Sequence, residues 1–269
     1  MALPDRKRGM NAPSVRPALR YTVRGTGRPV VLLHPIAMRL EFWDDVADRL
    51  ARHARVIALD LRGHGANLPT TEPFSIEDLA GDVVALCREI RLPPATFVGC
   101  SMGGMVAQGV ALAAPELVSG LVLANTTHAM SDAGAEVMRQ RAERASSDLR
   151  NTVEDDLKRW FSEAFRAANP RAVNKVRRWV LENDPRTIGF GWKAISRLGW
   201  GDRLATVRQP VLVTTGALDP ASPPAGARET AAAFPNGRYR EIADCGHFAP
   251  IERPEEFAAI VEELVRMTA

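Results

Sequence analysis

A serine between two glycines stands at the end of a short apolar run, where residues 99–103 read Gly-Cys-Ser-Met-Gly. The pattern G-x-S-x-G between a strand and a helix is typical of a nucleophile elbow, in which the serine occupies the tip of a tight, strained turn. Side chains at the two glycine positions would collide with the neighbouring helix or strand. The motif therefore predicts that Ser101 is a nucleophile and that the amide of Met102, at the start of a helix, points at the incoming carbonyl group.

An acid and a histidine follow this serine in the chain order typical of the motif. Asp219 comes just after an apolar run at residues 211–215, and His247 lies in a loop after the run at residues 239–242. In acyl transfer Ser101 attacks, His247 takes and returns the proton, and Asp219 fixes the histidine tautomer and stabilises the imidazolium. We therefore predict a catalytic triad of these three residues, against the alternative of a chance serine in a glycine-rich turn.

The second donor of an oxyanion hole is expected in the loop after residues 29–33, a continuous apolar run typical of a strand buried on both faces. This loop reads His34-Pro35-Ile36-Ala37. Proline has no amide hydrogen, so the backbone of Ile36 should be the donor, together with that of Met102. His34 is interpreted as a structural residue beneath the loop rather than as a base.

Strand-like and helix-like patterns alternate along most of the chain. This alternation predicts an α/β fold with a mostly parallel central sheet and helices on both faces. Residues 19–24 are expected to form an edge hairpin with residues 30–34. Ser75 precedes acidic residues in a first helical turn, so it should cap a helix that extends to about residue 90.

The strand pattern disappears between residues 125 and 204, where the sequence is helical and holds four of the five tryptophans. We expect this segment to be a lid that shields the active site from water and shapes the substrate pocket. His128 stands at its entrance as a candidate for substrate contact, with a hinge role as the equal alternative. Trp160 is a second candidate, although packing of the lid is the simpler interpretation of any single tryptophan.

Three parts of the chain follow from these patterns. We expect a mobile extension at residues 1–17, a core made of residues 18–124 and 205–269, and the inserted helical lid at residues 125–204. The 269 residues are sufficient for one such domain with its lid.

Composition excludes several classes of protein. The net charge of +3 is scattered, which favours solubility and some attraction for anionic substrates over nucleic-acid binding. Three dispersed cysteines are too few for a disulfide framework or a metal site. There is no 18-residue apolar span and no apolar segment after the charged N-terminus, so we expect a cytoplasmic protein without a membrane helix. A small-molecule substrate is the expected partner, and the oligomeric state is left open.

Several segments of the chain resemble the 3-oxoadipate enol-lactonases of the α/β-hydrolase superfamily, and the likeness extends over nearly everything after residue 18. The segments that carry it are His34 to Trp43, Asp60 to Gly65, Ile76 to Asp82, Gly99 to Gly104, Leu123 to Thr126, Arg159 to Arg166 and Gly216 to Pro224. The resemblance implies an α/β-hydrolase fold and hydrolysis of a five-membered enol-lactone to 3-oxoadipate in aromatic catabolism, without a cofactor. It also implies the triad and the two oxyanion donors already assigned.

The resemblance bears on the substrate pocket as well. Members of the family often have a tryptophan where Met138 stands and an arginine three residues later, which matches Arg141. Because the lactone is anionic, Arg141 or a nearby lid arginine is expected to bind its carboxylate. Some relatives place the triad acid after residues 120–124, but this chain has Asn125 there, which favours Asp219.

Other functions use the same residues. A general esterase or lactonase, or a hydrolase that cleaves carbon–carbon bonds of meta-cleavage products, would need the same triad, and perhydrolase or haloperoxidase side activity is compatible with it. A ligand-sensing module with slow turnover is the alternative of a different class. A complete triad with both oxyanion donors argues for turnover.

Overall fold

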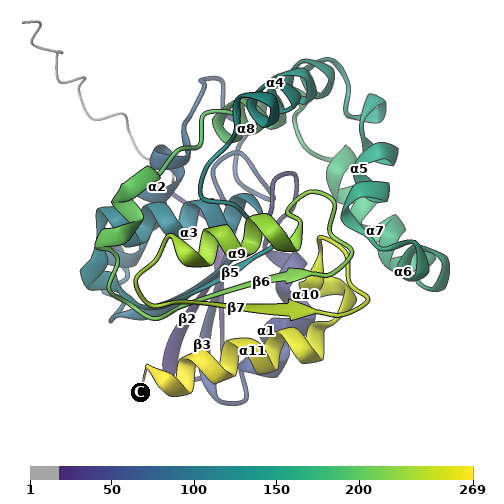
Figure 1. Cartoon of the computed structure of the whole chain (residues 1–269). Coiled ribbons are helices and arrows are strands. Elements are labelled where there is room, and N and C mark those ends of the chain that lie inside the picture. The colour runs from purple at the N-terminus through teal and green to yellow at the C-terminus, as the bar shows by residue number, and fades with distance from the viewer. Residues whose placement is uncertain (1–17, 269) are drawn as a thin grey trace, which may run out of the picture.

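The computed structural model describes residues 18–268, and Figure 1 shows the arrangement of its helices and strands. The expected N-terminal extension at residues 1–17 lies outside the described residues, as does residue 269. None of the described helices is both long enough and apolar enough to cross a membrane.

A single sheet runs through the described part of the chain, with its strands in the order β1-β3-β2-β4-β5-β6-β7. Only β1 runs antiparallel to its neighbour, so the predicted mostly parallel sheet is confirmed. The central strands are buried on both faces, as their continuous apolar sequences require. The strands are β1 (Tyr21–Arg24), β2 (Arg28–Leu33), β3 (Ala54–Leu59), β4 (Ala95–Cys100), β5 (Val118–Ala124), β6 (Val211–Gly216) and β7 (Gly237–Ile242).

The predicted hairpin between residues 19–24 and 30–34 is wrong. β1 pairs with β3, with Tyr21 opposite Leu59 and Arg24 opposite Val56. The reason is that β2 already has parallel neighbours along both of its edges, β3 and β4. Only the outer edge of β3 remains free for β1, whose half-exposed residues suit an edge strand.

Helices cover both faces of the sheet, as predicted. In Figure 1, α2, α3 and α9 lie on one face, and α1 and α11 lie on the other. The capping signature at Ser75 is confirmed, because its hydroxyl accepts from the Asp78 amide at 3.1 Å and the Asp78 carboxylate accepts from the Ser75 amide at 2.8 Å. The core helices are η1 (Leu40–Trp43), α1 (Asp44–Leu50), α2 (Ile76–Glu89), α3 (Met102–Ala113), η2 (Pro115–Leu117), η4 (Gly201–Thr206), α9 (Pro224–Ala232), α10 (Ala249–Glu252) and α11 (Pro254–Met267).

The lid between β5 and β6 is helical, as its sequence pattern indicates. Its helices α4 and α8 pack on each other above the sheet, while α6 and α7 extend to one side (Figure 1). A bridge between Ala129 and Gly199 closes the two ends of the segment together. The helices of the lid are α4 (Asp132–Ser147), η3 (Leu149–Asn151), α5 (Val153–Trp160), α6 (Glu163–Ala168), α7 (Pro170–Leu181) and α8 (Pro185–Ile195).

Candidate active site

The turn from β4 to α3 has the strained geometry of a nucleophile elbow. Ser101 lies at its tip with φ of 54° and ψ of −118°, a conformation that residues with a side chain rarely adopt. A Cβ atom at Gly99 would lie 2.2 Å from the carbonyl oxygen of Gly103, and one at Gly103 would lie 2.0 Å from that of Leu33. The close approach of β2, β4 and α3 therefore requires both glycines, for the reason that the sequence suggested.

Asp219 and His247 form a buried pair near this turn. Asp219 follows β6, and its Oδ2 accepts from His247 Nδ1 at 2.8 Å. Its Oδ1 accepts from the amides of Ala221 at 2.7 Å and Ser222 at 3.1 Å. Burial alone would raise the pKa of Asp219, but the neighbouring His247 and the hydrogen bonds outweigh it and lower the pKa to about 2. The carboxylate is therefore ionised at neutral pH and can hold Nδ1 as the donor, which leaves Nε2 to act as a base.

Asn125 takes part in this pair, which the sequence did not reveal. Its Nδ2 donates to Asp219 Oδ2 at 3.0 Å and to the carbonyl oxygen of Gly246 at 3.2 Å. The residue is fully buried and has a positive φ of 51°, a conformation that asparagine tolerates better than most residues. Asn125 thus joins the loop of Asp219 to the loop of His247.

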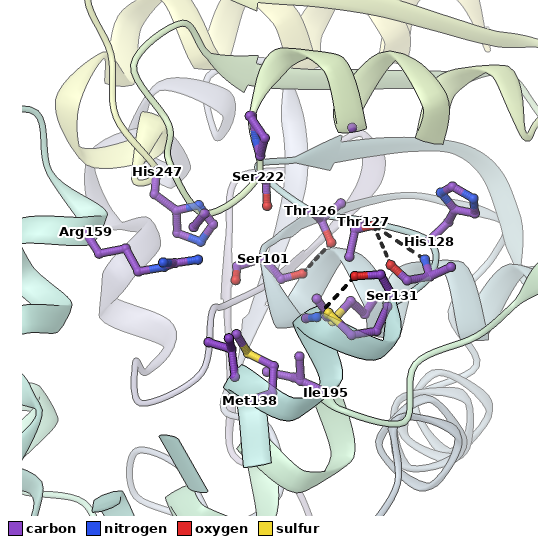
Figure 2. Close-up of a pocket in the computed structure, with 18 of the residues that line it drawn as sticks. Ser101, Thr126, Thr127, His128, Ser131, Met138, Arg159, Ile195, Ser222 and His247 are labelled. Carbon is purple, nitrogen blue, oxygen red and sulfur yellow. Dashed lines mark hydrogen bonds between the residues drawn. The ribbon is translucent and has the colours of Figure 1, made fainter. Parts of the chain in front are cut away.

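Ser101 and His247 line the same cavity, whose volume is about 670 Å³. Figure 2 shows the two side chains facing this space from the elbow and from the loop after β7. Within the described chain, no hydrogen bond links Ser101 Oγ to His247 Nε2. Hydrogen bonds of this kind are often long without substrate and tighten in the reacting complex, so the arrangement is compatible with the predicted triad.

The cavity has two kinds of wall. Lid side chains form an apolar wall, with Met138, Trp192 and Ile195 among them, and loops after β5 and β6 supply polar groups such as Thr126 and Ser222. Figure 2 shows Met138 and Ile195 on one side of Ser101 and Ser222 on another. A mainly apolar cavity with a few placed polar groups is typical of small-molecule sites.

Two of the predicted substrate contacts, His128 and Trp160, line this cavity. The His128 Nδ1 lies 3.1 Å from the hydroxyl of Thr230, and burial lowers the pKa of His128, which keeps the ring neutral at pH 7. The Trp160 ring stacks on Phe248 with 4.9 Å between the ring centroids. Their positions allow substrate contact, which stays a prediction.

The third predicted contact, Arg141, is placed elsewhere. Its guanidinium forms an ion pair with Asp156 and lies over the ring of Trp192, 4.6 Å from the centroid. It is not among the side chains of residues 18–268 that line the cavity. Asp156 on α5 gives Arg141 on α4 a carboxylate within the protein itself, so binding of a substrate carboxylate by Arg141 stays a prediction that this position does not favour.

The lid arginine that does line the cavity is Arg159. It is half-buried, and it forms no ion pair with another described residue. Figure 2 shows its guanidinium reaching from the lid toward Ser101 and His247. The sequence contained this residue in a cluster of lid cations, but helix periodicity could not indicate which of them faces Ser101.

The predicted oxyanion donors lie close to the elbow. Met102 is the first residue of α3, where amides have no acceptor within the helix. The carbonyl groups of Leu33 and His34 pack directly against Gly103, so the loop that carries Ile36 adjoins this helix start. The assignment of the amides of Ile36 and Met102 as the oxyanion hole stays a prediction.

His34 has the structural surroundings that the sequence suggested. Its Nε2 accepts from the Leu61 amide at 2.9 Å, and its Nδ1 donates to the carbonyl oxygen of Pro35 at 2.7 Å. Burial lowers the pKa of His34 to about 4, so the ring is neutral at pH 7. Both ring nitrogens are occupied, which leaves His34 no role as a base.

No group of three or more His, Cys, Asp or Glu side chains within the described ranges is placed to hold a metal ion. Cys87, Cys100 and Cys245 are free and buried, and burial raises the pKa of each thiol.

Comparison with known proteins gives a consistent assignment. The profile of the alpha/beta hydrolase fold family matches residues 28–254. The chain is 28% identical to 3-oxoadipate enol-lactonase 2 of Acinetobacter baylyi over 93% of each protein, and 30% identical to the pimeloyl-(acyl-carrier protein) methyl ester esterase of Aromatoleum aromaticum over 88% of the chain and 98% of that protein. Among solved structures, a thermophilic esterase from Thermogutta terrifontis with malate bound superposes with a TM-score of 0.88, at 28% identity over 93% of each chain.

Proposed function

The chain belongs to the alpha/beta hydrolase fold family, and from this we propose that it is a serine hydrolase that cleaves a small lactone or carboxylic ester through an acyl-enzyme. The observation that carries the proposal is the buried His247–Asp219 pair, 2.8 Å apart, at a cavity that the strained Ser101 also lines. Such a pair next to a serine at the tip of an elbow is the arrangement that acyl transfer requires.

The proposed reaction has two halves. His247 Nε2 takes the proton of Ser101 Oγ as this oxygen attacks the carbonyl carbon, and the amides of Ile36 and Met102 stabilise the oxyanion. The carbon–oxygen bond of the ester then breaks, and His247 returns the proton to the leaving oxygen. In a lactone this oxygen stays attached to the acyl group, because the ring has only been opened. Water, deprotonated by His247, then attacks the carbonyl carbon of the acyl-enzyme. The bond from this carbon to Ser101 Oγ breaks, and His247 returns the proton to Oγ as the acid is released.

The position of Arg159 supports the proposal that the substrate is anionic. A half-buried guanidinium without an ion-pair partner in residues 18–268 faces the cavity beside the nucleophile. A substrate carboxylate could form a charge-assisted, bidentate contact with it. 3-Oxoadipate enol-lactone, which carries a carboxylate and has the required ring ester, is therefore the best candidate substrate, in line with the resemblance to enol-lactonases and a role in aromatic catabolism.

The size of the cavity favours a second candidate, a general esterase or lactonase. A volume of about 670 Å³ lies in the range that holds drug-sized ligands, more than a small lactone needs. The methionines of its wall, Met105, Met130 and Met138, are flexible and adapt to different apolar groups.

Steady-state hydrolysis of p-nitrophenyl acetate and of the enol-lactone by the wild type and by Ser101→Ala tests the proposal. We expect the wild type to turn over both, with the larger kcat/KM for the lactone. Ser101→Ala should lose many orders of magnitude on both substrates while its circular dichroism stays unchanged, because only the oxyanion hole and binding remain. Activity of Ser101→Ala within tenfold of the wild type would overturn the assignment. Turnover of the ester alone would select the general esterase, and a single burst without turnover would indicate a sensing module.

A further inference from the structure

A buried carboxylate outside the triad lies close to the base. Glu252, at the end of α10, is 5% exposed and forms no ion pair with any of residues 18–268. Its Oε1 accepts from the amides of Ser162 at 3.0 Å and Gly246 at 3.1 Å, and its Oε2 accepts from the Ser162 hydroxyl at 2.6 Å. Burying a carboxylate costs free energy unless such bonds offset it, so the position calls for a reason.

The three bonds join two segments that are far apart in sequence. Ser162 belongs to the lid, where its hydroxyl also caps α6 by accepting from Phe165. Gly246 directly precedes His247 in the loop after β7. A single carboxylate thus holds the lid and the loop of the base together.

Main-chain bonds connect the same two segments on their other side. The carbonyl oxygen of Trp160 accepts from the amide of His247 at 2.9 Å and from that of Phe248 at 3.1 Å. The rings of Trp160 and Phe248 stack on each other. The lid segment 160–162 and the loop 246–248 therefore form one unit, with Glu252 at one end and the Trp160 carbonyl group at the other.

Gly246 is needed for this contact. A Cβ atom there would lie 2.7 Å from Glu252 Oε1 and 2.7 Å from the Ser162 amide nitrogen. Both distances are too short for a side chain, so the carboxylate reaches the two amides only because position 246 has none.

The position of His247 depends on this loop. The residue lies outside any helix or strand, yet its Nδ1 must stay on Asp219 while Nε2 serves Ser101 in both halves of the reaction. A displacement of about 1 Å in a catalytic group can lower a rate on the order of 100-fold. Hydrogen bonds that fix the loop therefore act directly on the rate.

We propose that Glu252 is a positioning residue for His247, which acts by tying the loop of the base to lid segment 160–162. The same carboxylate then also fixes the part of the cavity wall that Trp160 forms. The proposal rests on the proposed role of His247 as the base.

Three variants separate this role from a general contribution to stability. Glu252→Ala removes all three hydrogen bonds. Glu252→Gln is the matched control, because its Oε1 still accepts from both amides and the Ser162 hydroxyl can rotate to accept from the new amide group. Glu252→Asp keeps the charge, but its side chain is one methylene shorter, so the carboxylate no longer reaches the same groups. It replaces Glu252→Ala as the test if the alanine variant does not fold.

The measurement is the rate at which a fluorophosphonate modifies Ser101, together with kcat and KM for p-nitrophenyl acetate, on protein shown to be folded. We expect Glu252→Ala and Glu252→Asp to lower the modification rate and kcat by about 10- to 100-fold, with KM for this small neutral ester nearly unchanged. Glu252→Gln should stay within about threefold of the wild type, since it keeps both amide contacts. A purely structural role would lower the melting temperature and leave these rates intact.

Wild-type rates in the folded Glu252→Asp variant would overturn the inference, as would equal losses in Glu252→Gln and Glu252→Ala. Ser101→Ala, measured alongside, keeps this result apart from the proposed function. If Ser101→Ala is inactive and the Glu252 variants are not impaired, only the positioning role fails. If Ser101→Ala remains active, the proposed function itself fails.

Discussion

The core and the lid hold their polar side chains by different means. At the carboxyl edge of the sheet, backbone geometry places Ser101, and backbone amides hold the Asp219 carboxylate. In the lid, charged side chains are held by pairing with each other, as the contact of Arg141 with Asp156 and that of Arg177 with Glu154 show. A side chain whose position is set by backbone geometry depends on few other side chains. A side chain held in an ion pair changes its position when either partner is replaced.

Asp219→Asn should have the largest effect, and it acts on the core. The shape of the side chain is kept, but the amide cannot hold the His247 tautomer, so kcat should fall on the order of 10³- to 10⁴-fold. Asp244→Asn is the matched control, because this exposed residue lies in the same loop as His247. Stopped-flow or steady-state ester hydrolysis measures both. A silent Asp219→Asn beside an inactive Asp244→Asn would show that the acid has been misassigned.

Acid should weaken the core through two buried histidines. Burial lowers the pKa of His34 to about 4 and that of His64 to about 3, both below the usual 6.5. The unfolded chain therefore binds these protons at a higher pH than the folded chain does. The contribution of the two neutral histidines to the free energy of unfolding is fully present above pH 6.5 and is lost as the pH falls toward 4 for His34 and 3 for His64. Each pH unit of difference corresponds to about 1.4 kcal/mol per group.

Urea unfolding at pH 7, 5 and 4 measures this loss. His64→Asn offers a control, since its amide can replace the hydrogen bond from His64 Nδ1 to the Arg62 carbonyl group at 2.9 Å. The variant should show a shallower dependence on pH. An unchanged slope would locate the acid sensitivity in other groups.

Breaking the buried ion pair of the lid should lower the free energy of unfolding somewhat less than protonation of both buried histidines. Asp156→Asn leaves Arg141 without its carboxylate partner. Both side chains are largely buried, since that of Asp156 is 4% exposed and that of Arg141 is 16% exposed. Loss of one partner of a buried pair lowers the free energy of unfolding by about 3–5 kcal/mol. Glu154→Gln, which breaks the more exposed pair with Arg177, should cost less than about 1 kcal/mol. Chemical denaturation compares the two variants, and equal costs would contradict the distinction.

Arg159→Ala should have the smallest effect and should leave stability intact. Loss of a charge-assisted contact of about 1.5–3 kcal/mol raises KM for the anionic lactone by about 10- to 100-fold. Hydrolysis of a neutral ester of similar size should barely change. Equal losses on both substrates would assign Arg159 to lid structure instead, and the enol-lactone would then give way to the general ester as the substrate.

The sequence predicts well the features that backbone geometry determines, and poorly those that depend on ion pairs between side chains. The elbow glycines and the Ser75 cap depend on residues within a few positions of each other, so a local pattern suffices. The partner of Arg141 on α4 depends on where the chain places α5, which carries Asp156, and no local pattern contains this. The predicted pairing of β1 was wrong for a related reason, because the partner of β1 depends on which strand edge the rest of the sheet leaves free.

Asn125 and Glu252 show a third case. Both are buried polar residues that bond to backbone and side-chain groups of distant loops, and nothing around them in the sequence indicates these partners. Their positions, just after β5 and shortly after His247, were the available signal. Polar residues next to predicted catalytic loops are thus worth testing as supports for those loops.

The unequal attachment of the lid determines where segments of this protein can be exchanged with those of a homologue. Residues 160–162 share hydrogen bonds with the loop of His247 and with Glu252, so a foreign sequence there should disturb the position of the proposed base. Helices α4 and α8 pack on each other and meet the cavity through side chains such as Met138 and Ile195. A chimaera that replaces these two helices together and keeps residues 160–162 should therefore inherit the substrate range of the donor while retaining the hydrolytic rate of the recipient.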